Sequence, residues 1–223
     1  EAAHRTGNGR TVMKTDELIE MLARGAGPAP RAVAARRLVP AAAAGLAASA
    51  LLALGLFGSI PMAMYASAAP WIKLGYAVSL ALAAAWLTAR LARPLAQSLV
   101  QQRAVKCVIC VMGLFGLAAV MVAAPADRTA MLLGSSWASC PWNVLGLSLP
   151  ALAATMWALR GLAPTRPRAA GFAAGLFAGA LGALGYALAC PEVSTTFVAL
   201  WYSLGIALSG ALGALLGPSA LRW

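Results

Sequence analysis

The sequence predicts an all-α membrane protein, a six-transmembrane-helix bundle with both termini cytoplasmic. The first reason is composition: of the 223 residues, 61% are hydrophobic and only 10% are charged, whereas a soluble domain is about 25% charged. The second reason is that six apolar runs approach the length of about 20 residues that crosses a bilayer as a helix. The third reason is that basic residues gather in alternate connections between those runs.

The apolar runs divide the chain into three parts. They lie at residues 38–59, 72–91, 107–124, 141–159, 169–189 and 196–216. Together they make a transmembrane domain over residues 38–223. Residues 13–37 precede this domain as a cytoplasmic N-terminal segment. Residues 1–12 form a polar leader that we expect to be disordered.

The distribution of basic residues predicts the orientation in the membrane. They occur before the first run, between the second and third, and between the fourth and fifth, at Arg24, Arg31, Arg36, Arg37, Arg90, Arg93, Arg103, Lys106, Arg160, Arg166 and Arg168. The other side of the predicted bundle has only Lys73 and Arg128 as cations. Because Lys and Arg concentrate in cytoplasmic connections, both termini are predicted to lie in the cytoplasm. The same pattern accounts for the net charge of +11 without direct nucleic-acid binding, since no separate basic domain presents these charges.

Small residues recur at helical spacing in the last two runs. They are Gly171, Gly175, Gly179 and Gly182 in the fifth run and Gly213 and Gly217 in the sixth. Spacings of three and four residues place them on one side of a helix, where they permit close backbone contact in a membrane. We therefore expect tight helix packing here, with the fifth run beside the fourth, its antiparallel neighbour.

Two of the four cysteines stand directly before prolines, at Cys140 and Cys190. In the predicted topology the fourth run begins and the fifth run ends at the periplasmic face, so the two thiols can meet there. A disulfide, a redox-sensitive thiol pair and a soft-metal site all suit an oxidising compartment. Small buried residues near helix ends are the plain alternative. Because Cys140 stands at a helix N-terminus, whose positive dipole end favours a thiolate, we predict that it is the more reactive thiol and Cys190 the resolving one.

Other chemical signatures in the sequence are weak. Cys107 and Cys110 form a C-x-x-C motif, but it faces the reducing cytoplasm and offers zinc two ligands of the usual four. His4 is the only histidine and the acidic residues are dispersed, so no catalytic triad or carboxylate pair can be assembled. We therefore expect no enzymatic activity and no cofactor. A membrane thiol oxidoreductase using quinone is the main alternative, and a small channel or exporter is the next.

The N-terminal segment contains a predicted amphipathic helix, in the stretch TDELIEMLAR. Thr15 is a suitable N-cap, and Asp16 complements the helix dipole. Leu18, Ile19 and Leu22 share one face of this helix. A helix of about ten residues is marginal alone in water, so the apolar face requires a partner. A protein and the bilayer surface would both meet that requirement.

Several stretches of the chain resemble one known family. They are MKTDELIEMLA, SSWASCPWN, LRGLAPTRPRAAG, YALACPE, WYSLGIALSGALGALLGP and the closing LRW, and the resemblance extends over residues 13–223. The sequence resembles the NrsF family of bacterial inner-membrane proteins, which are six-span anti-sigma factors. The resemblance implies that the chain holds an extracytoplasmic-function sigma factor inactive at the membrane and releases it under heavy-metal or oxidative stress.

The resemblance also implies roles for particular residues. Stress would be sensed by the pair Cys140 and Cys190, as a redox pair or as soft-metal ligands. We expect the sigma factor to contact the N-terminal helix at Asp16, Leu18, Ile19 and Leu22. Family members often have a histidine directly before the second cysteine, where this chain has Ala189. That difference weakens a metal site and favours thiol chemistry. The resemblance leaves the oligomeric state open.

Overall fold

The computed structural model describes residues 15–16, 19–21, 33–93, 97–162 and 164–222. Contacts divide the chain into two units, Glu1–Val33 and Ala34–Trp223. In the first unit, the described residues 15–16 and 19–21 are helical. The predicted leader, residues 1–12, lies outside the described residues.

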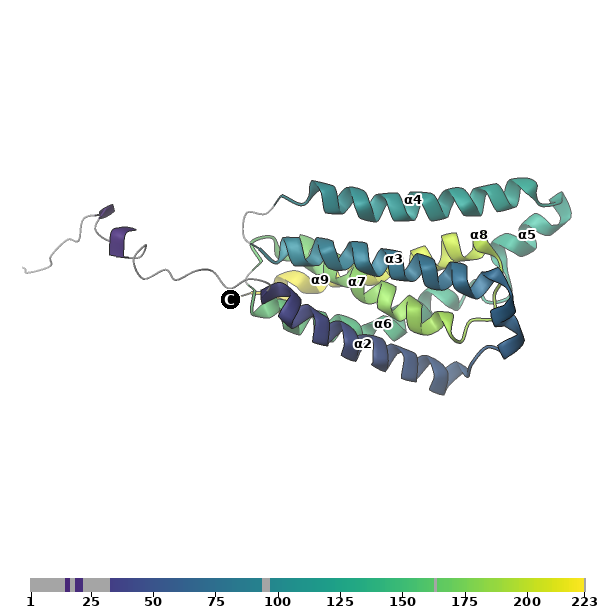
Figure 1. Ribbon diagram of the computed structural model, residues 1–223, viewed down its shortest axis with the longest axis horizontal. Coiled ribbons are helices and arrows are strands. Elements are labelled where there is room, and N and C mark those ends of the chain that lie inside the picture. The colour runs from purple at the N-terminus through teal and green to yellow at the C-terminus, as the bar shows by residue number, and fades with distance from the viewer. Residues whose placement is uncertain (1–14, 17–18, 22–32, 94–96, 163, 223) are drawn as a thin grey trace, which may run out of the picture. The chain divides into compact units, whose positions relative to one another are not determined.

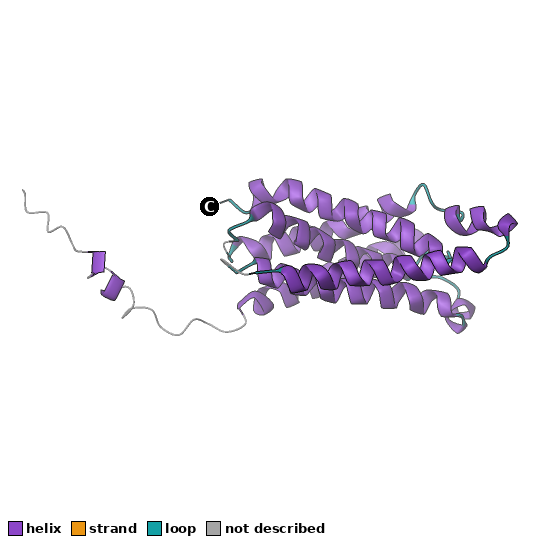
Figure 2. Ribbon diagram, turned by 90° about the horizontal axis from the view of Figure 1, so that it is seen from above, coloured by secondary structure: helices purple, strands orange, loops and turns teal. Residues whose placement is uncertain are grey.

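Six long helices form the second unit and run side by side along its length (Figures 1 and 2). They are α2 (Val33–Phe57), α3 (Ala68–Leu91), α4 (Leu99–Val122), α6 (Cys140–Arg160), α7 (Pro167–Ala187) and the continuous element Thr195–Ala220, which comprises α8 (Thr195–Phe197), the π-helical turn η2 (Val198–Tyr202) and α9 (Ser203–Ala220). Each is long and apolar enough to cross a membrane. The prediction of six helical spans is thus confirmed, while the orientation of the termini stays a prediction.

The third span begins earlier than the sequence predicts. We expected it to start at residue 107, but α4 starts at Leu99. The hydropathy pattern excluded this first part of the helix because it contains Arg103 and Lys106. Both side chains are exposed, and long basic side chains can bury their aliphatic stems while the charge reaches the polar interface.

Helix α7 occupies the centre of the bundle, and 83% of the residues in its most apolar stretch are buried. It packs most extensively on α9 and less on α3 and α6. Its Ala- and Gly-rich sequence explains this position, because small side chains let neighbouring backbones approach closely where lipid gives little hydrophobic drive for association. The outward sides of other helices are apolar, as at Leu82 and Leu215, which are 67% and 76% exposed.

The glycines of α7 face three different helices rather than one. A side chain added at Gly171 or Gly175 would collide with the backbone of α9, and one added at Gly213 would collide with α7 in return. Gly179 also faces α9, but Gly182 faces Ser148 of α6 and Gly185 faces Ser49 of α2. The fifth span does pack beside the fourth, as expected, but the principal neighbour of its glycine face is the sixth span. The close approach at Gly175 brings α9 near enough to leave no space for a methyl group.

Three short helices gather at one end of the bundle. They are the 3₁₀ helix η1 (Met62–Ala66), α5 (Pro125–Leu133) and α8. Helix α5 is fastened to the last span by two hydrogen bonds: Ser194 Oγ donates to the Met131 carbonyl at 2.8 Å, and Trp201 Nε1 donates to the Leu132 carbonyl at 2.8 Å. We call this the thiol end, because it contains Cys140 and Cys190.

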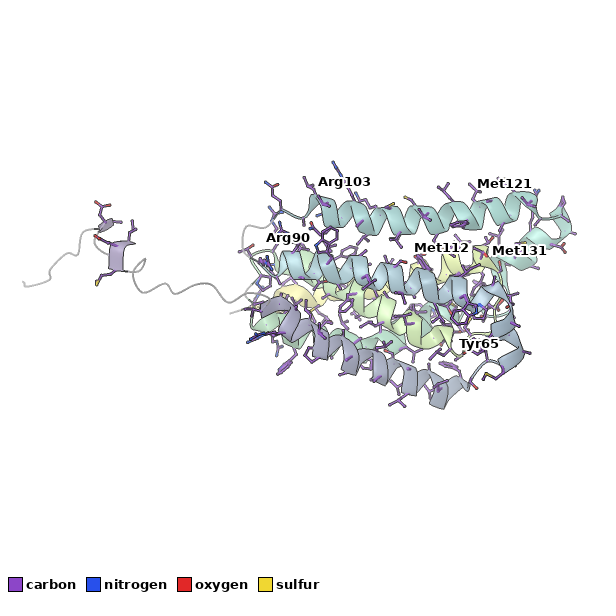
Figure 3. The ribbon with its side chains drawn as sticks, in the orientation of Figure 1. Tyr65, Arg90, Arg103, Met112, Met121 and Met131 are labelled. Carbon is purple, nitrogen blue, oxygen red and sulfur yellow. The ribbon has the colours of Figure 1, made fainter. Side chains whose placement is uncertain are left out.

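The opposite end of the bundle contains the connections α3–α4 and α6–α7, and we call it the arginine end. In Figure 3, Arg90 and Arg103 lie at this end, whereas Tyr65 and Met121 lie toward the thiol end. Arg160 Nε donates to the carbonyl of Ala220 at 2.7 Å and so joins the last turns of α6 and α9. The two ends are thus chemically distinct, with arginines gathered at one and the buried thiols Cys140 and Cys190 at the other.

Candidate functional site

The structure brings the two cysteines of the Cys-Pro pairs together at the thiol end. Cys140 is the first residue of α6, and its N–H donates to the carbonyl of Ser136 at 2.9 Å. Cys190 follows α7, and its N–H donates to the carbonyl of Tyr186 at 2.9 Å. Both thiols are free, fully buried and within electrostatic range of each other. Because both thiols are fully buried, a reagent can reach them only when the surrounding structure opens locally.

A buried lysine lies beside the thiol pair. Lys73 of α3 is only 1% exposed, and its Nζ donates to the carbonyl of Cys190 at 2.7 Å. The same ammonium lies within electrostatic range of both thiols and of the Glu192 carboxylate. A buried cation is costly unless it is paired and hydrogen-bonded. Its presence here therefore marks a specialised polar site within an apolar bundle.

Lys73 was not a predicted site residue, although the sequence contained a signal. It is the single charged residue between Ala68 and Ala89, within a helix that is long and apolar enough to cross a membrane. We counted it only as a charge of the periplasmic side. Lys73 and Cys190 lie 117 positions apart in the chain, so only the tertiary structure reveals their contact.

A carboxylate clamp holds the loop in front of Cys140 against the loop that contains Cys190. Oε1 of Glu192 accepts hydrogen bonds from Ser135, through N–H at 2.8 Å and Oγ at 2.6 Å, and from Ser136, through N–H and Oγ at 3.1 Å each. Burial raises the pKa of the Glu192 carboxyl, but these hydrogen bonds outweigh it and hold the pKa below its ordinary value.

The clamp depends on a glycine at its edge. Gly134 adopts a positive φ of 55°, a region that favours glycine. A Cβ at this position would stand 2.6 Å from Oε2 of Glu192. The sequence Gly134-Ser135-Ser136 therefore provides both the turn and the donors that fix the carboxylate.

Two tyrosines, Tyr186 and Tyr202, lie near the thiols. The rings of Tyr186 and Tyr202 lie with centroids 5.8 Å apart, and Asn143 Nδ2 donates to the Tyr186 hydroxyl at 3.2 Å. Tyr202 is fully buried, and its hydroxyl lies within electrostatic range of both thiols. That hydroxyl makes no well-formed hydrogen bond to any described residue. The Cys190 thiol acts on this hydroxyl as a weak hydrogen-bonding neighbour, so a reaction at that thiol would change the surroundings of a fully buried polar group.

The cysteines of the C-x-x-C motif do not belong to this site. Cys107 and Cys110 are exposed on α4, and among the described residues no group of three or more metal-binding side chains occurs. In the N-terminal unit, Asp16 is exposed and Ile19 is 59% exposed. The predicted contacts Leu18 and Leu22 lie outside the described residues.

The family model and two relatives that match this chain all belong to one family. Residues 22–223 match the family model described as "NrsF: Negative regulator of sigma F". The chain is 41% identical over 215 residues to the "Probable anti-sigma-F factor NrsF" of Azospira oryzae, a match that covers 95% of this chain and all of that protein. It is also 41% identical over 217 residues to the "Anti-sigma-F factor NrsF" of Caulobacter vibrioides, with the same coverage. No solved structure matches the chain significantly.

Proposed function

The chain belongs to the NrsF family of negative regulators of sigma F, and we propose that it is an anti-sigma factor of the bacterial inner membrane that sequesters an extracytoplasmic-function sigma factor. The observation that carries this proposal is the match of 95% of the chain to two anti-sigma-F factors. Family membership makes the chain a regulator rather than an enzyme, which removes the reason to prefer a quinone-linked thiol oxidoreductase.

The N-terminal helix is the proposed docking element for the sigma factor. Its face would comprise Asp16, Leu18, Ile19 and Leu22. Two described positions support this assignment, because Asp16 and Ile19 are exposed in the N-terminal unit. An exposed apolar side chain on a short helix gains stability when a groove of a partner protein covers it. With the predicted orientation, this helix lies in the cytoplasm, where a sigma factor resides.

Co-purification with the cognate sigma factor tests this assignment. The full chain should retain the sigma factor, whereas a variant without residues 13–30 should lose it. The matched control is a variant without residues 1–12, which precede the region of the family resemblance and should leave binding intact. Ile19→Asp should weaken binding by at least tenfold without shortening the chain. Retention of the sigma factor by both the shortened chain and Ile19→Asp would refute docking through this helix.

The thiol pair is the proposed sensor of heavy-metal or oxidative stress. An oxidant that accepts two electrons would convert Cys140 and Cys190 into a disulfide with release of two protons. A soft divalent cation would instead displace the two thiol protons. Either exchange leaves the net charge of the site unchanged, with Lys73 and Glu192 still balancing each other. That neutrality favours both reactions, because an uncompensated charge in this buried site would be costly.

A change at the thiols would be relayed through α7 to the arginine end. Joining the two sulfurs, directly or through a metal ion, draws the start of α6 toward the segment that follows α7. Helix α7 then shifts against α9, where many of the facing residues are small, among them several glycines and Ser209. Small side chains offer few interlocking contacts, so such an interface can adopt a second register. The shift would reach the cytoplasmic connections and release the sigma factor.

A transcriptional reporter of the sigma factor tests the sensor. The double variant Cys140→Ser with Cys190→Ser should eliminate induction by a soft metal and by an oxidant. The matched control is Cys107→Ser with Cys110→Ser, which removes the two exposed thiols and should respond normally. An unchanged response in the first double variant would contradict sensing at this pair and would leave the sigma-binding proposal intact.

A further inference from the structure

The arginine end contains a polar pocket that plays no part in the thiol site. It has a volume of about 290 Å³. It lies between the α3–α4 and α6–α7 connections, and its polar lining residues are Arg93, Gln97, Ser98, Gln102, Thr165 and Arg166. The lining contains two cations and no carboxylate. The two carboxylates that the structure describes in the second unit, Asp127 and Glu192, belong to the thiol end.

Two helices begin at this pocket. Helix α4 starts at Leu99 after Ser98, and α7 starts at Pro167 after Arg166. Neither N-cap side chain accepts a hydrogen bond from a backbone N–H of its helix, although Ser98 Oγ accepts one from the side-chain Nε2 of Gln102 at 2.9 Å. The first N–H groups of a helix have no partner within the helix, and they form the positive end of its dipole. The pocket thus combines two guanidinium groups with two positive helix ends, an arrangement that attracts a phosphate-like anion.

An apolar groove of about 340 Å³ continues directly from the polar pocket. The two share Leu91 and Gln102. Beyond them, the groove runs between α4 and α7 past Ile109, Phe172 and Ala207, and the first two of these side chains are 37% and 42% exposed. The groove therefore opens on the outer, apolar surface of a helix that is long enough to cross a membrane.

We propose that the pocket and the groove together bind one anionic phospholipid, with its phosphate between Arg93 and Arg166 and one acyl chain in the groove. A free phosphate would leave the apolar groove unfilled. A zwitterionic lipid would bring its own ammonium into a pocket that is already positive. An anionic lipid satisfies both parts, and basic pockets between transmembrane helices are known to hold such headgroups. The proposal requires only that the bundle lies in a bilayer, and it does not depend on thiol sensing.

Native mass spectrometry of the full chain in detergent tests the proposal by titration with phosphatidylglycerol. Each basic residue near an anionic lipid contributes about 1 kcal/mol. The double variant Arg93→Gln with Arg166→Gln should therefore bind phosphatidylglycerol about 30-fold more weakly, since a factor of ten corresponds to about 1.4 kcal/mol. The matched control is Arg103→Gln with Arg168→Gln. These arginines are exposed on the same two helices and do not line the pocket, so their loss should change the affinity by less than threefold.

A second variant tests the groove without altering any charge. Ala207→Phe places a ring in the groove and should weaken phosphatidylglycerol binding at least tenfold. It also keeps the proposal testable if the double arginine variant does not fold. Three results would overturn the proposal: equal affinity for phosphatidylcholine, full competition by inorganic phosphate at equal concentration, or equal loss of affinity in the control variant. Full competition by phosphate would identify a soluble-anion site instead.

Discussion

Lys73 provides the sharpest test of how the thiol end is held closed. We expect Lys73→Met to expose the thiols, because methionine has a similar length but leaves the carbonyl of Cys190 without its donor at 2.7 Å. A hydrogen bond from a charged group contributes about 1.5–3 kcal/mol. A loss of about 2 kcal/mol raises the population of locally opened molecules about 30-fold, at about 1.4 kcal/mol per factor of ten.

The assay for Lys73 is the rate of maleimide labelling at the site. It requires a background with Cys107→Ser and Cys110→Ser, because those two thiols are exposed and would dominate the signal. When opening and closing are fast relative to the reaction, the labelling rate follows the open population. Lys73→Met should therefore label about 30 times faster, and Lys106→Met, an exposed lysine of α4, should label at the original rate. Equal rates for Lys73→Met and the parent protein would refute the anchoring role of this lysine.

Three further outcomes can be checked. The pKa of Glu192 is below its ordinary value of 4.5, so the clamp should be fully formed above pH 4.5 and should weaken as the pH falls through the lowered pKa. Thiol labelling of the parent protein should therefore accelerate in acid. A Glu192→Gln variant should lack this pH dependence. Gly175→Ala should destabilise the bundle by about 1–3 kcal/mol in reversible unfolding, because it forces α7 away from α9, whereas Gly146→Ala, which meets open space, should be tolerated. Single-thiol variants should show Cys140 reacting faster than Cys190; the reverse order would refute the predicted role of the helix dipole.

Several features of the fold could be read from the sequence because they depend on local patterns. The six spans follow from hydropathy alone, since a bilayer requires each helix to satisfy its own backbone hydrogen bonds. Helix α5 was missed, although Pro125 at its start, Asp127 in its first turn and Gly134 at its end are ordinary helix signals. It was missed because the stretch is too short to cross a membrane and was treated as part of a connection.

For the functional site too, the sequence predicts some features and only the tertiary structure reveals the others. The repeated Cys-Pro pair and the alternation of charge were enough to place both thiols at one end of a six-helix bundle. Their burial, the ammonium of Lys73 against the Cys190 carbonyl and the clamp on Glu192 came only from the packed structure. Each of these depends on side chains that lie 50 or more positions apart in the chain. A linear pattern records which residues face the same side of a helix, but only the packing of several helices determines which of them touch.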